Sequence, residues 1–267
     1  MRRLASAMLL MTAATTQAAP TSQVDWHWQR DTPVCSLRQV FAADGRTIQI
    51  SRTAGSDGTS IRIGSYDGML PTRTSREDDF LDGKITFEPG QPIEAHIWTT
   101  ADKGRRDISA GVDSDILTTF AKSSAVEIAH DKIGKVRAPV RSAAAAVEAL
   151  RNCEDSKLRE WEIDPAAWHA LKAKPSPIRP PTGWLSADDY PATSIINGVQ
   201  GFVIARFEIA ADGTVLECRA IRRNRSIHYK DRLCPKLKQR ARFKPALDAN
   251  GKPVAAPYVL VIQFRLA

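Results

Sequence analysis

The sequence predicts an α+β protein of two domains: a mostly-β, sandwich-like N-terminal domain, then a small C-terminal domain with a three-stranded antiparallel sheet and helices. The 267-residue chain is longer than one average domain, which favours two. The first half alternates short β-like runs with turn signals, which is typical of antiparallel β structure. The last third reads as strand, strand, helix and strand, and so predicts a second module with its own core.

The chain begins with a stretch that is typical of a secretory signal peptide, residues 1–18. Two arginines supply positive charge, residues 4–14 form a short apolar run, and small residues precede Ala18. An apolar run this short does not span a bilayer. We therefore expect export with cleavage near Ala18; the alternative is that the run is retained as an inner-membrane anchor.

Residues 24–155 carry the signals of the β domain. Its β-like runs are RTIQISRT, TSIRIGSY, KITFEPG and IEAHIWTT. The turn signals around these runs are Asp44-Gly45, Asp57-Gly58, Asp67-Gly68 and Asp82-Gly83. Two helical segments are expected among the strands, Ser114–Lys122 and the alanine-rich Ser142–Cys153.

A connecting segment and a proline-rich linker are predicted at residues 156–183. Leu158–Leu171 forms the connection. The stretch KAKPSPIRPPTGW, which starts at Lys172, contains four prolines and shows no apolar periodicity. This composition predicts a stiff linker, and we place the domain boundary there, so that the C-terminal domain covers residues 184–267.

The C-terminal domain is predicted to begin its sheet with a β-hairpin. Between Phe202 and Ile209 apolar and charged residues alternate, which predicts a strand with one core face. Asp212-Gly213 suits a tight reversal, and Val215–Ile221 is the returning strand.

A helix and a last strand complete the domain. Apolar residues four apart predict a helix that starts near Leu233 or Cys234, which puts Pro235 in its first turn. Apolar residues then alternate again over Tyr258–Leu266, which predicts the closing strand.

Four cysteines in an exported chain indicate disulfides rather than a metal site or a nucleophile. Of three possible pairings we favour Cys35 with Cys153 and Cys218 with Cys234, because each closes a loop within one proposed domain. A metal site built from Cys218, Cys234 and His228 would lack a close C-x-x-C pair and a fourth ligand. No metal is therefore expected.

The net charge is +8, and basic residues are densest between Arg219 and Lys244. Such a run can mark a nucleic-acid site. In an exported protein it is better explained by a solvated face, or by attraction to anionic lipid headgroups, wall polymers or an acidic partner. We therefore expect no nucleic-acid partner.

The sequence offers little catalytic signal. It contains no H-E-x-x-H, G-x-S-x-G, P-loop or G-x-G-x-x-G motif, and its five histidines are dispersed. Asp113 and Asp115 flank Ser114 before a helical run, where helix capping explains them better than acid–base catalysis. We expect neither enzyme activity nor a cofactor; a cell-envelope enzyme with its active site in the β domain is the alternative.

The N-terminal layout combines a tryptophan-rich start, an early Cys35, β-hairpins and a late helix that ends in Cys153. This layout resembles the invasion-associated locus B family of bacterial periplasmic proteins. The resemblance implies a β-sandwich-like periplasmic module whose terminal cysteines are bonded. A bond across so long a loop contributes about 4 to 5 kcal/mol in the chain-entropy picture.

Short motifs mark the C-terminal residues: Tyr190-Pro191, Gly201 at the first strand, Asp212-Gly213 at the turn and Arg242-Phe243-Lys244-Pro245 after the helix. Over about residues 184–267 they resemble the C-terminal domain of TonB, the periplasmic end of the bacterial energy transducer. TonB-like domains also place one cysteine in the second strand and one in the following helix, as Cys218 and Cys234 stand here. The resemblance implies a protein-binding module in the periplasm of a Gram-negative bacterium.

The resemblance also implies where a partner binds. In TonB-like domains the last strand lies at a sheet edge and accepts an extended segment of an outer-membrane transporter by β-strand addition. The matching element here starts at Tyr258. If its apolar face is buried, alternation turns Val259, Val261, Gln263 and Arg265 outward, where they would set specificity. The alternative is that another part of the chain, or a second copy in a homodimer, covers this edge.

The chain also departs from a working transducer. A transducer keeps a membrane helix and a long proline-rich spacer, whereas this chain has a short signal-like run and a folded β domain. We therefore expect a periplasmic, non-enzymatic protein that binds a transporter segment or another envelope component. A membrane-anchored energy transducer for TonB-dependent transport is the alternative.

Overall fold

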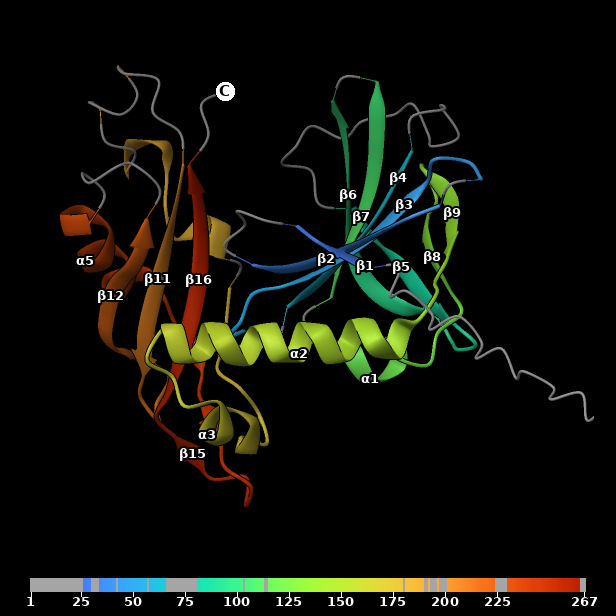
Figure 1. The fold of residues 1–267 in the computed structure, drawn as a ribbon. Coiled ribbons are helices and arrows are strands. Elements are labelled where there is room, and N and C mark those ends of the chain that lie inside the picture. Colours follow the sequence, from blue (N-terminus) through green and yellow to red (C-terminus); the bar gives the residue numbers. More distant parts are fainter. Residues whose placement is uncertain are drawn as a thin grey trace, which may run out of the picture.

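The computed structural model of the chain describes residues 26–29, 34–41, 43–56, 58–65, 81–102, 104–112, 115–179, 181–189, 192, 196, 201–223 and 230–264. These residues form an α+β fold in which a nine-stranded sheet is followed by a three-stranded sheet with helices (Figure 1). The predicted fold class is therefore confirmed. The predicted signal peptide and the Tyr190-Pro191 motif lie outside the described residues.

The first nine strands form one antiparallel sheet in the order β1-β2-β3-β4-β7-β6-β5-β8-β9. Its two ends approach each other, because the indole N–H of Trp26 donates to the carbonyl of Arg141, just after β9, at 2.7 Å. The enclosed core is rich in isoleucine and includes the rings of Phe87 and Phe120. The strands are β1 (Trp26–Trp28), β2 (Cys35–Val40), β3 (Thr47–Arg52), β4 (Thr59–Ser65), β5 (Leu81–Glu88), β6 (Ile93–Asp102), β7 (Arg105–Val112), β8 (Ala125–His130) and β9 (Gly134–Pro139).

One predicted turn in this sheet is wrong. Asp82-Gly83 lies inside β5 rather than at a reversal. A side chain at Gly83 would meet Ile97 of β6 and would lie 2.8 Å from the carbonyl oxygen of Ala129 in β8. The glycine there serves close packing between strands and not a turn. Asp67-Gly68 lies outside the described residues.

Three helices follow or interrupt the large sheet: α1 (Leu117–Phe120), α2 (Ala143–Glu160) and α3 (Pro165–Ala170). The first is shorter than predicted, and the second continues past Cys153 through residues of good helix propensity. Figure 1 shows α2 running along the base of both sheets. The predicted connecting segment thus contains the end of α2 and all of α3.

The proline-rich stretch lies along the C-terminal residues. Within it β10 (Ser176–Pro177) pairs with β13 (Phe243–Lys244). The Lys172 N–H donates to the carbonyl of Leu247 at 2.9 Å, just before this pairing. The first half of the proline-rich stretch is therefore held against the C-terminal residues by backbone hydrogen bonds. The short elements nearby are η1 (Pro181–Gly183), η2 (Ala187–Asp189), β14 (Ala246–Leu247) and β15 (Pro253–Val254).

The second sheet is antiparallel and has the order β12-β11-β16. Its strands are β11 (Gly201–Ile209), β12 (Val215–Arg223) and β16 (Ala256–Phe264). The predicted Asp212-Gly213 turn joins the first two, with Gly213 at a φ of 84°. Helix α5 (Lys230–Arg240) covers one face with buried Leu233 and Leu237, and Ala241 just after the helix continues this contact.

The predicted start of this helix is wrong. The helix begins at Lys230, so Pro235 lies inside it and not in its first turn. Proline removes one intrahelical hydrogen bond and crowds the preceding turn. Here Cys234 is bonded to β12, and Leu233 and Leu237 are buried on either side, so tertiary contacts hold the turn in place.

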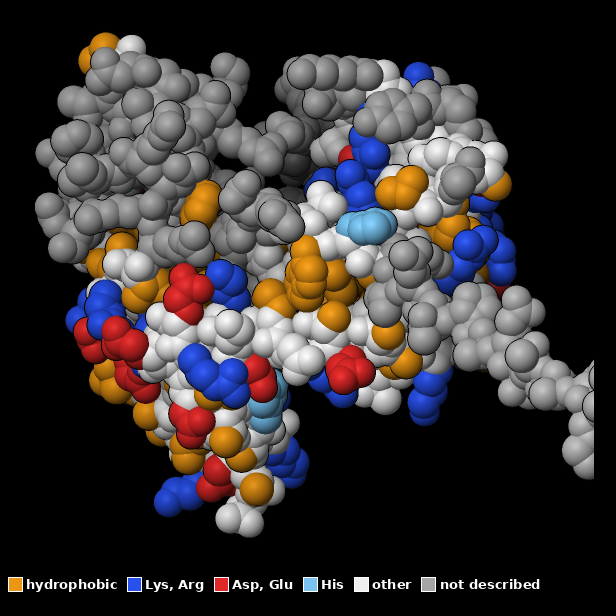
Figure 2. All heavy atoms as spheres, viewed as in Figure 1, with side chains coloured by type: hydrophobic (Ala, Val, Ile, Leu, Met, Phe, Trp, Pro, Cys, Tyr) orange, Lys and Arg blue, Asp and Glu red, His pale blue; other side chains and the backbone are white. Residues whose placement is uncertain are grey.

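The exposed face over α2 and α3 is mixed in charge. Figure 2 shows acidic and basic side chains interspersed there, as on a solvated face. In the described part of the chain, no helix combines the length and apolarity needed to cross a membrane.

Candidate protein-binding edge strand

Strand β16 gives the three-stranded sheet a regular edge. At the other edge, β12 pairs with β11 through two register shifts, at Ile204/Ala205 and at Glu208/Ile209. Such irregularities twist an edge and make it a poor template for a further strand. Strand β16 instead pairs with β11 in unbroken register along its whole length. An extended partner segment would therefore find the better template on β16.

The backbone groups at this edge can be assigned from one hydrogen bond. The Val259 N–H donates to the carbonyl of Gly55 at 3.0 Å, and so points away from β11. The N–H and C=O of one residue point to the same side of an antiparallel strand, and the side alternates along it. Val261 and Gln263 therefore direct their N–H groups to the sheet edge, away from β11. Pro257, which has no N–H, occupies an equivalent edge position.

One face of β16 packs into the core beneath α5. Tyr258 is 7% exposed there, with its ring centroid 4.9 Å from that of Phe243. Phe207 and Trp184 complete this aromatic cluster. The predicted buried face is therefore present. The backbone groups of Tyr258 point to β11, where Phe207 is its register partner, so Tyr258 offers an added strand neither its backbone groups nor much of its side chain.

The other face of β16 does not point outward, contrary to the expectation for Val259 and Val261. Val259 is 1% exposed and belongs to a second buried cluster, distinct from the aromatic one. Val261 is partly buried against this second cluster. That cluster is formed by the end of α2, the segment after it and α3, with Trp161 and Trp168 as its largest members. Alternation correctly separated the two faces of the strand, but the second face is covered by the chain itself. The side chain of Gln263, and Arg265 as a whole, lie outside the described residues.

Both favoured disulfides are present. Cys35 in β2 is bonded to Cys153 in α2 across 118 residues. Cys218 in β12 is bonded to Cys234 in α5 across 16 residues. The second bond fastens α5 to the strand opposite β16, so it stabilises the sheet without blocking the β16 edge.

Comparison with known families shows what the C-terminal part of the chain resembles. Residues 186–266 match the family described as Gram-negative bacterial TonB protein C-terminal. The comparisons found no matching curated protein and no matching solved structure. The match covers the three-stranded sheet and α5, and leaves out the nine-stranded sheet with α1 to α3.

The family match supports three coarse statements. The TonB C-terminal family consists of non-catalytic interaction domains, it belongs to the Gram-negative envelope, and its members bind protein components of the outer membrane. The predicted resemblance is therefore confirmed for this region, which we call the TonB-like region. The candidate binding edge and the disulfide of β12 and α5 both lie within it.

A carboxylate clamp fastens the start of the TonB-like region to α5. The side chain of Asp189 is 3% exposed and accepts hydrogen bonds from Lys236 and, at 2.6 Å, from Arg240. The Ser186 N–H also donates to it at 2.9 Å. Lys236 first, then Ser186 and Arg240, hold the pKa of the Asp189 carboxyl well below its usual range.

Replacing Asp189 with asparagine is expected to lower the free energy of unfolding at pH 7 by about 2 kcal/mol, since charge-assisted hydrogen bonds are lost. Because the folded-state pKa of Asp189 is lowered, its carboxylate contributes fully to the free energy of unfolding above the unfolded-state pKa. This contribution disappears as the pH falls through the folded-state pKa. The deficit of the variant should therefore shrink below about pH 4. Urea denaturation across pH 2–7 measures it, with exposed Asp188→Asn as the control. An equal deficit in both variants would contradict the clamp.

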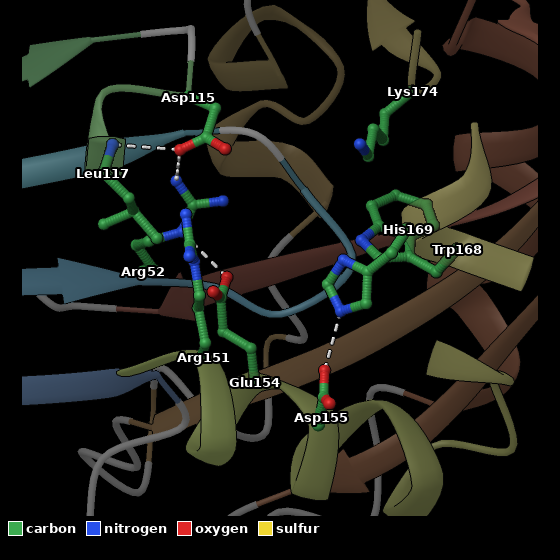
Figure 3. Close-up of a pocket in the computed structure, with 9 residues that line it drawn as sticks. All are labelled: Arg52, Asp115, Leu117, Arg151, Glu154, Asp155, Trp168, His169 and Lys174. Atoms are coloured by element: carbon green, nitrogen blue, oxygen red, sulfur yellow. Dashed lines mark hydrogen bonds and ion pairs between the residues drawn. The ribbon is translucent and has the colours of Figure 1, made fainter. Parts of the chain in front are cut away.

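A second site candidate is a pocket of about 450 Å³ outside the TonB-like region. It lies between the large sheet, α2 and α3, and Figure 3 shows its charged side chains converging on the hollow. The polar side chains that line it pair with one another: Arg52 with Glu154 at 2.8 Å, and His169 with Asp155 at 2.7 Å. Asp115, which the sequence predicts as a helix cap, accepts from the Leu117 N–H at 3.0 Å.

The sequence did not predict the seam at which α2 packs against both sheets. The Arg52–Glu154 pair joins residues that are far apart in the chain, and single-sequence patterns carry no signal for it. Trp161 and Trp168 did carry a signal, because two tryptophans in a supposed connecting segment indicate burial. Their burial against β16 makes α2 and α3 part of the surroundings of the candidate binding edge.

Proposed function

We propose that this chain is a periplasmic protein whose TonB-like region binds an extended segment of a protein partner as a fourth strand beside β16. The partner is a segment of an outer-membrane transporter or another envelope component. The observation that carries the proposal is the unbroken register of β16 with β11, which leaves aligned backbone groups at the opposite edge. Strand addition satisfies such groups largely irrespective of side chains.

The two covered faces of the three-stranded sheet also support binding by strand addition. With α5 on one face and the cluster of Trp161 and Trp168 on the other, both broad surfaces are already packed. The edge of β16 remains as the place where backbone groups of Val261 and Gln263 can be shared. Affinity would come mainly from backbone hydrogen bonds, so a backbone change should matter more than a side-chain change.

Replacing Val261 with proline is expected to weaken peptide binding at least tenfold, because it removes one edge donor and places a ring against the incoming strand. The probes are synthetic peptides tiled over the N-terminal segments of outer-membrane transporters of the host bacterium. Binding to the full oxidised chain is measured by fluorescence anisotropy. Val261→Ala is the matched control, since it shortens the same side chain but keeps the N–H.

Circular dichroism and thermal melting establish that both variants are folded. A folded proline variant that binds the peptides with unchanged affinity would rule out strand addition at β16. A second copy of the chain is a competing occupant of this edge. Concentration-dependent dimerisation that Val261→Pro abolishes, without peptide binding, would identify the homodimer instead.

A further inference from the structure

The turn between β3 and β4 reaches from the large sheet to the edge of β16. Its Gly55 carbonyl accepts the Val259 N–H at 3.0 Å, which is one of the bonds that a partner strand would make. Ala54 beside it is 1% exposed and belongs to the same cluster as Ile204 and Val259. The turn therefore makes both a polar and an apolar contact with the candidate binding site.

The fit of this turn depends on glycine. Gly55 has a φ of 79°, and a Cβ atom there would lie 2.6 Å from Cγ2 of Val259. Gly58, at the other end of the turn, would place a Cβ atom in open space. The close approach is therefore specific to Gly55, where any side chain would push the turn away from β16.

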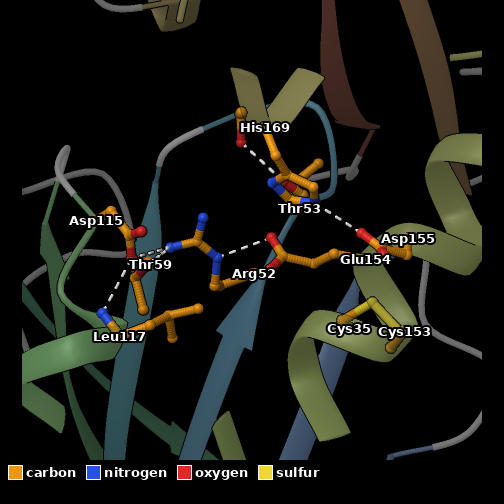
Figure 4. Close-up of polar contacts among 11 residues, drawn as sticks. Cys35, Arg52, Thr53, Thr59, Asp115, Leu117, Cys153, Glu154, Asp155 and His169 are labelled. Carbon is orange, nitrogen blue, oxygen red and sulfur yellow. Dashed lines mark hydrogen bonds and ion pairs between the residues drawn. A yellow bond between two sulfur atoms is a disulfide. The ribbon is translucent and has the colours of Figure 1, made fainter. Parts of the chain in front are cut away.

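The base of the turn is fixed to α2. Arg52 ends β3, and its guanidinium donates to Glu154 in α2 at 2.8 Å and to the Thr59 hydroxyl of β4 at 2.7 Å (Figure 4). Arg52 and Thr59 are also register partners in the hairpin. Because both strands are held at the base, the tip is presented to β16 in one position.

We propose that the β3–β4 turn is an intramolecular cap that competes with the partner strand for the edge of β16. The inference rests on the proposed strand addition. While the cap is closed, a partner can pair with the edge from Val261 onward but not at Val259. Full pairing requires the cap to open, so the apparent affinity is reduced by the fraction of molecules in which it is open.

Gly55→Val is expected to open the cap, and Gly58→Ala is the matched control on the same turn. The first readout is amide hydrogen exchange of the full oxidised chain. The Val259 amide should exchange at least tenfold faster in Gly55→Val, whereas the Leu260 amide, bonded to β11, should not change. Gly55→Ala should give a smaller effect in the same direction and serves as the test if the valine variant does not fold.

The second readout is affinity for the transporter-derived peptides. Gly55→Val should bind them at least tenfold more tightly than wild type, and Gly58→Ala should bind like wild type. Unchanged or weaker binding by a folded Gly55→Val would overturn the cap while leaving strand addition intact. Unchanged Val259 exchange would also overturn it. Absence of peptide binding in wild type and in all variants would instead overturn the proposed function, and the cap with it.

Discussion

Removal of the Cys35–Cys153 bond by a double change to alanine is expected to lower the free energy of unfolding by about 4 to 5 kcal/mol. The bond closes a loop of 118 residues, and in the chain-entropy picture a longer closed loop restricts the unfolded chain more. Cys35 is also 1% exposed in the main core. Urea denaturation followed by tryptophan fluorescence measures the loss.

The second disulfide provides the matched comparison. Cys218 and Cys234 are 16 residues apart, so their double change to alanine should lose only about 3 kcal/mol. Both variants remove one bond and leave no free thiol. A smaller loss for the long loop than for the short one would contradict the entropic account and point to strain or residual structure in the unfolded state.

Local patterns predicted the elements of the TonB-like region well, because strands and turns there depend on near neighbours. The alternation around Phe207 and the Asp212-Gly213 turn are both as expected. The disulfide pairing also followed, since each bond lies within one proposed domain. The domain limits themselves stay predictions.

The failures come from contacts between distant parts of the chain. Alternation in β16 separates two faces, but no local signal shows that α2 and α3 cover the face of Val259. The same holds for Pro235, which a helix tolerates here because a disulfide and buried leucines hold the turn. Asp82-Gly83 reads as a turn locally, yet in the fold it allows close packing of β5 against β6.

Replacing Glu154 with alanine is expected to lower the free energy of unfolding by about 3 to 5 kcal/mol, because it leaves a buried guanidinium without its main partner. Arg52 is 6% exposed and Glu154 is 8% exposed. Asp115, at 3.4 Å, and the Thr59 hydroxyl remain, but Asp115 is largely exposed. Urea denaturation at pH 7 measures the loss.

The double change Arg52→Met with Glu154→Leu is the matched control. It removes both charges and restores apolar volume, so its stability should lie within about 1 kcal/mol of wild type. Because Arg52 and Cys35 are register partners, and Glu154 follows Cys153 in α2, the ion pair stands beside the disulfide (Figure 4). A double variant as unstable as Glu154→Ala would show that packing at this seam, and not an unpaired charge, dominates.

The pH dependence of the free energy of unfolding distinguishes the Glu154 carboxyl from the Asp189 carboxyl. Burial raises the pKa of Glu154 above its ordinary value of 4.5, although Arg52 opposes the shift. A raised folded-state pKa means that the folded protein holds the Glu154 proton more tightly than the unfolded chain does. The part of the folding free energy that comes from this proton is therefore complete below pH 4.5 and is lost as the pH rises through the folded pKa. The stability of wild type relative to Glu154→Gln should therefore fall as the pH rises from 4 through that pKa. A difference that rises over this range would mean that the ion pair with Arg52 outweighs burial, and Glu154 would then act as an ordinary salt-bridge carboxylate.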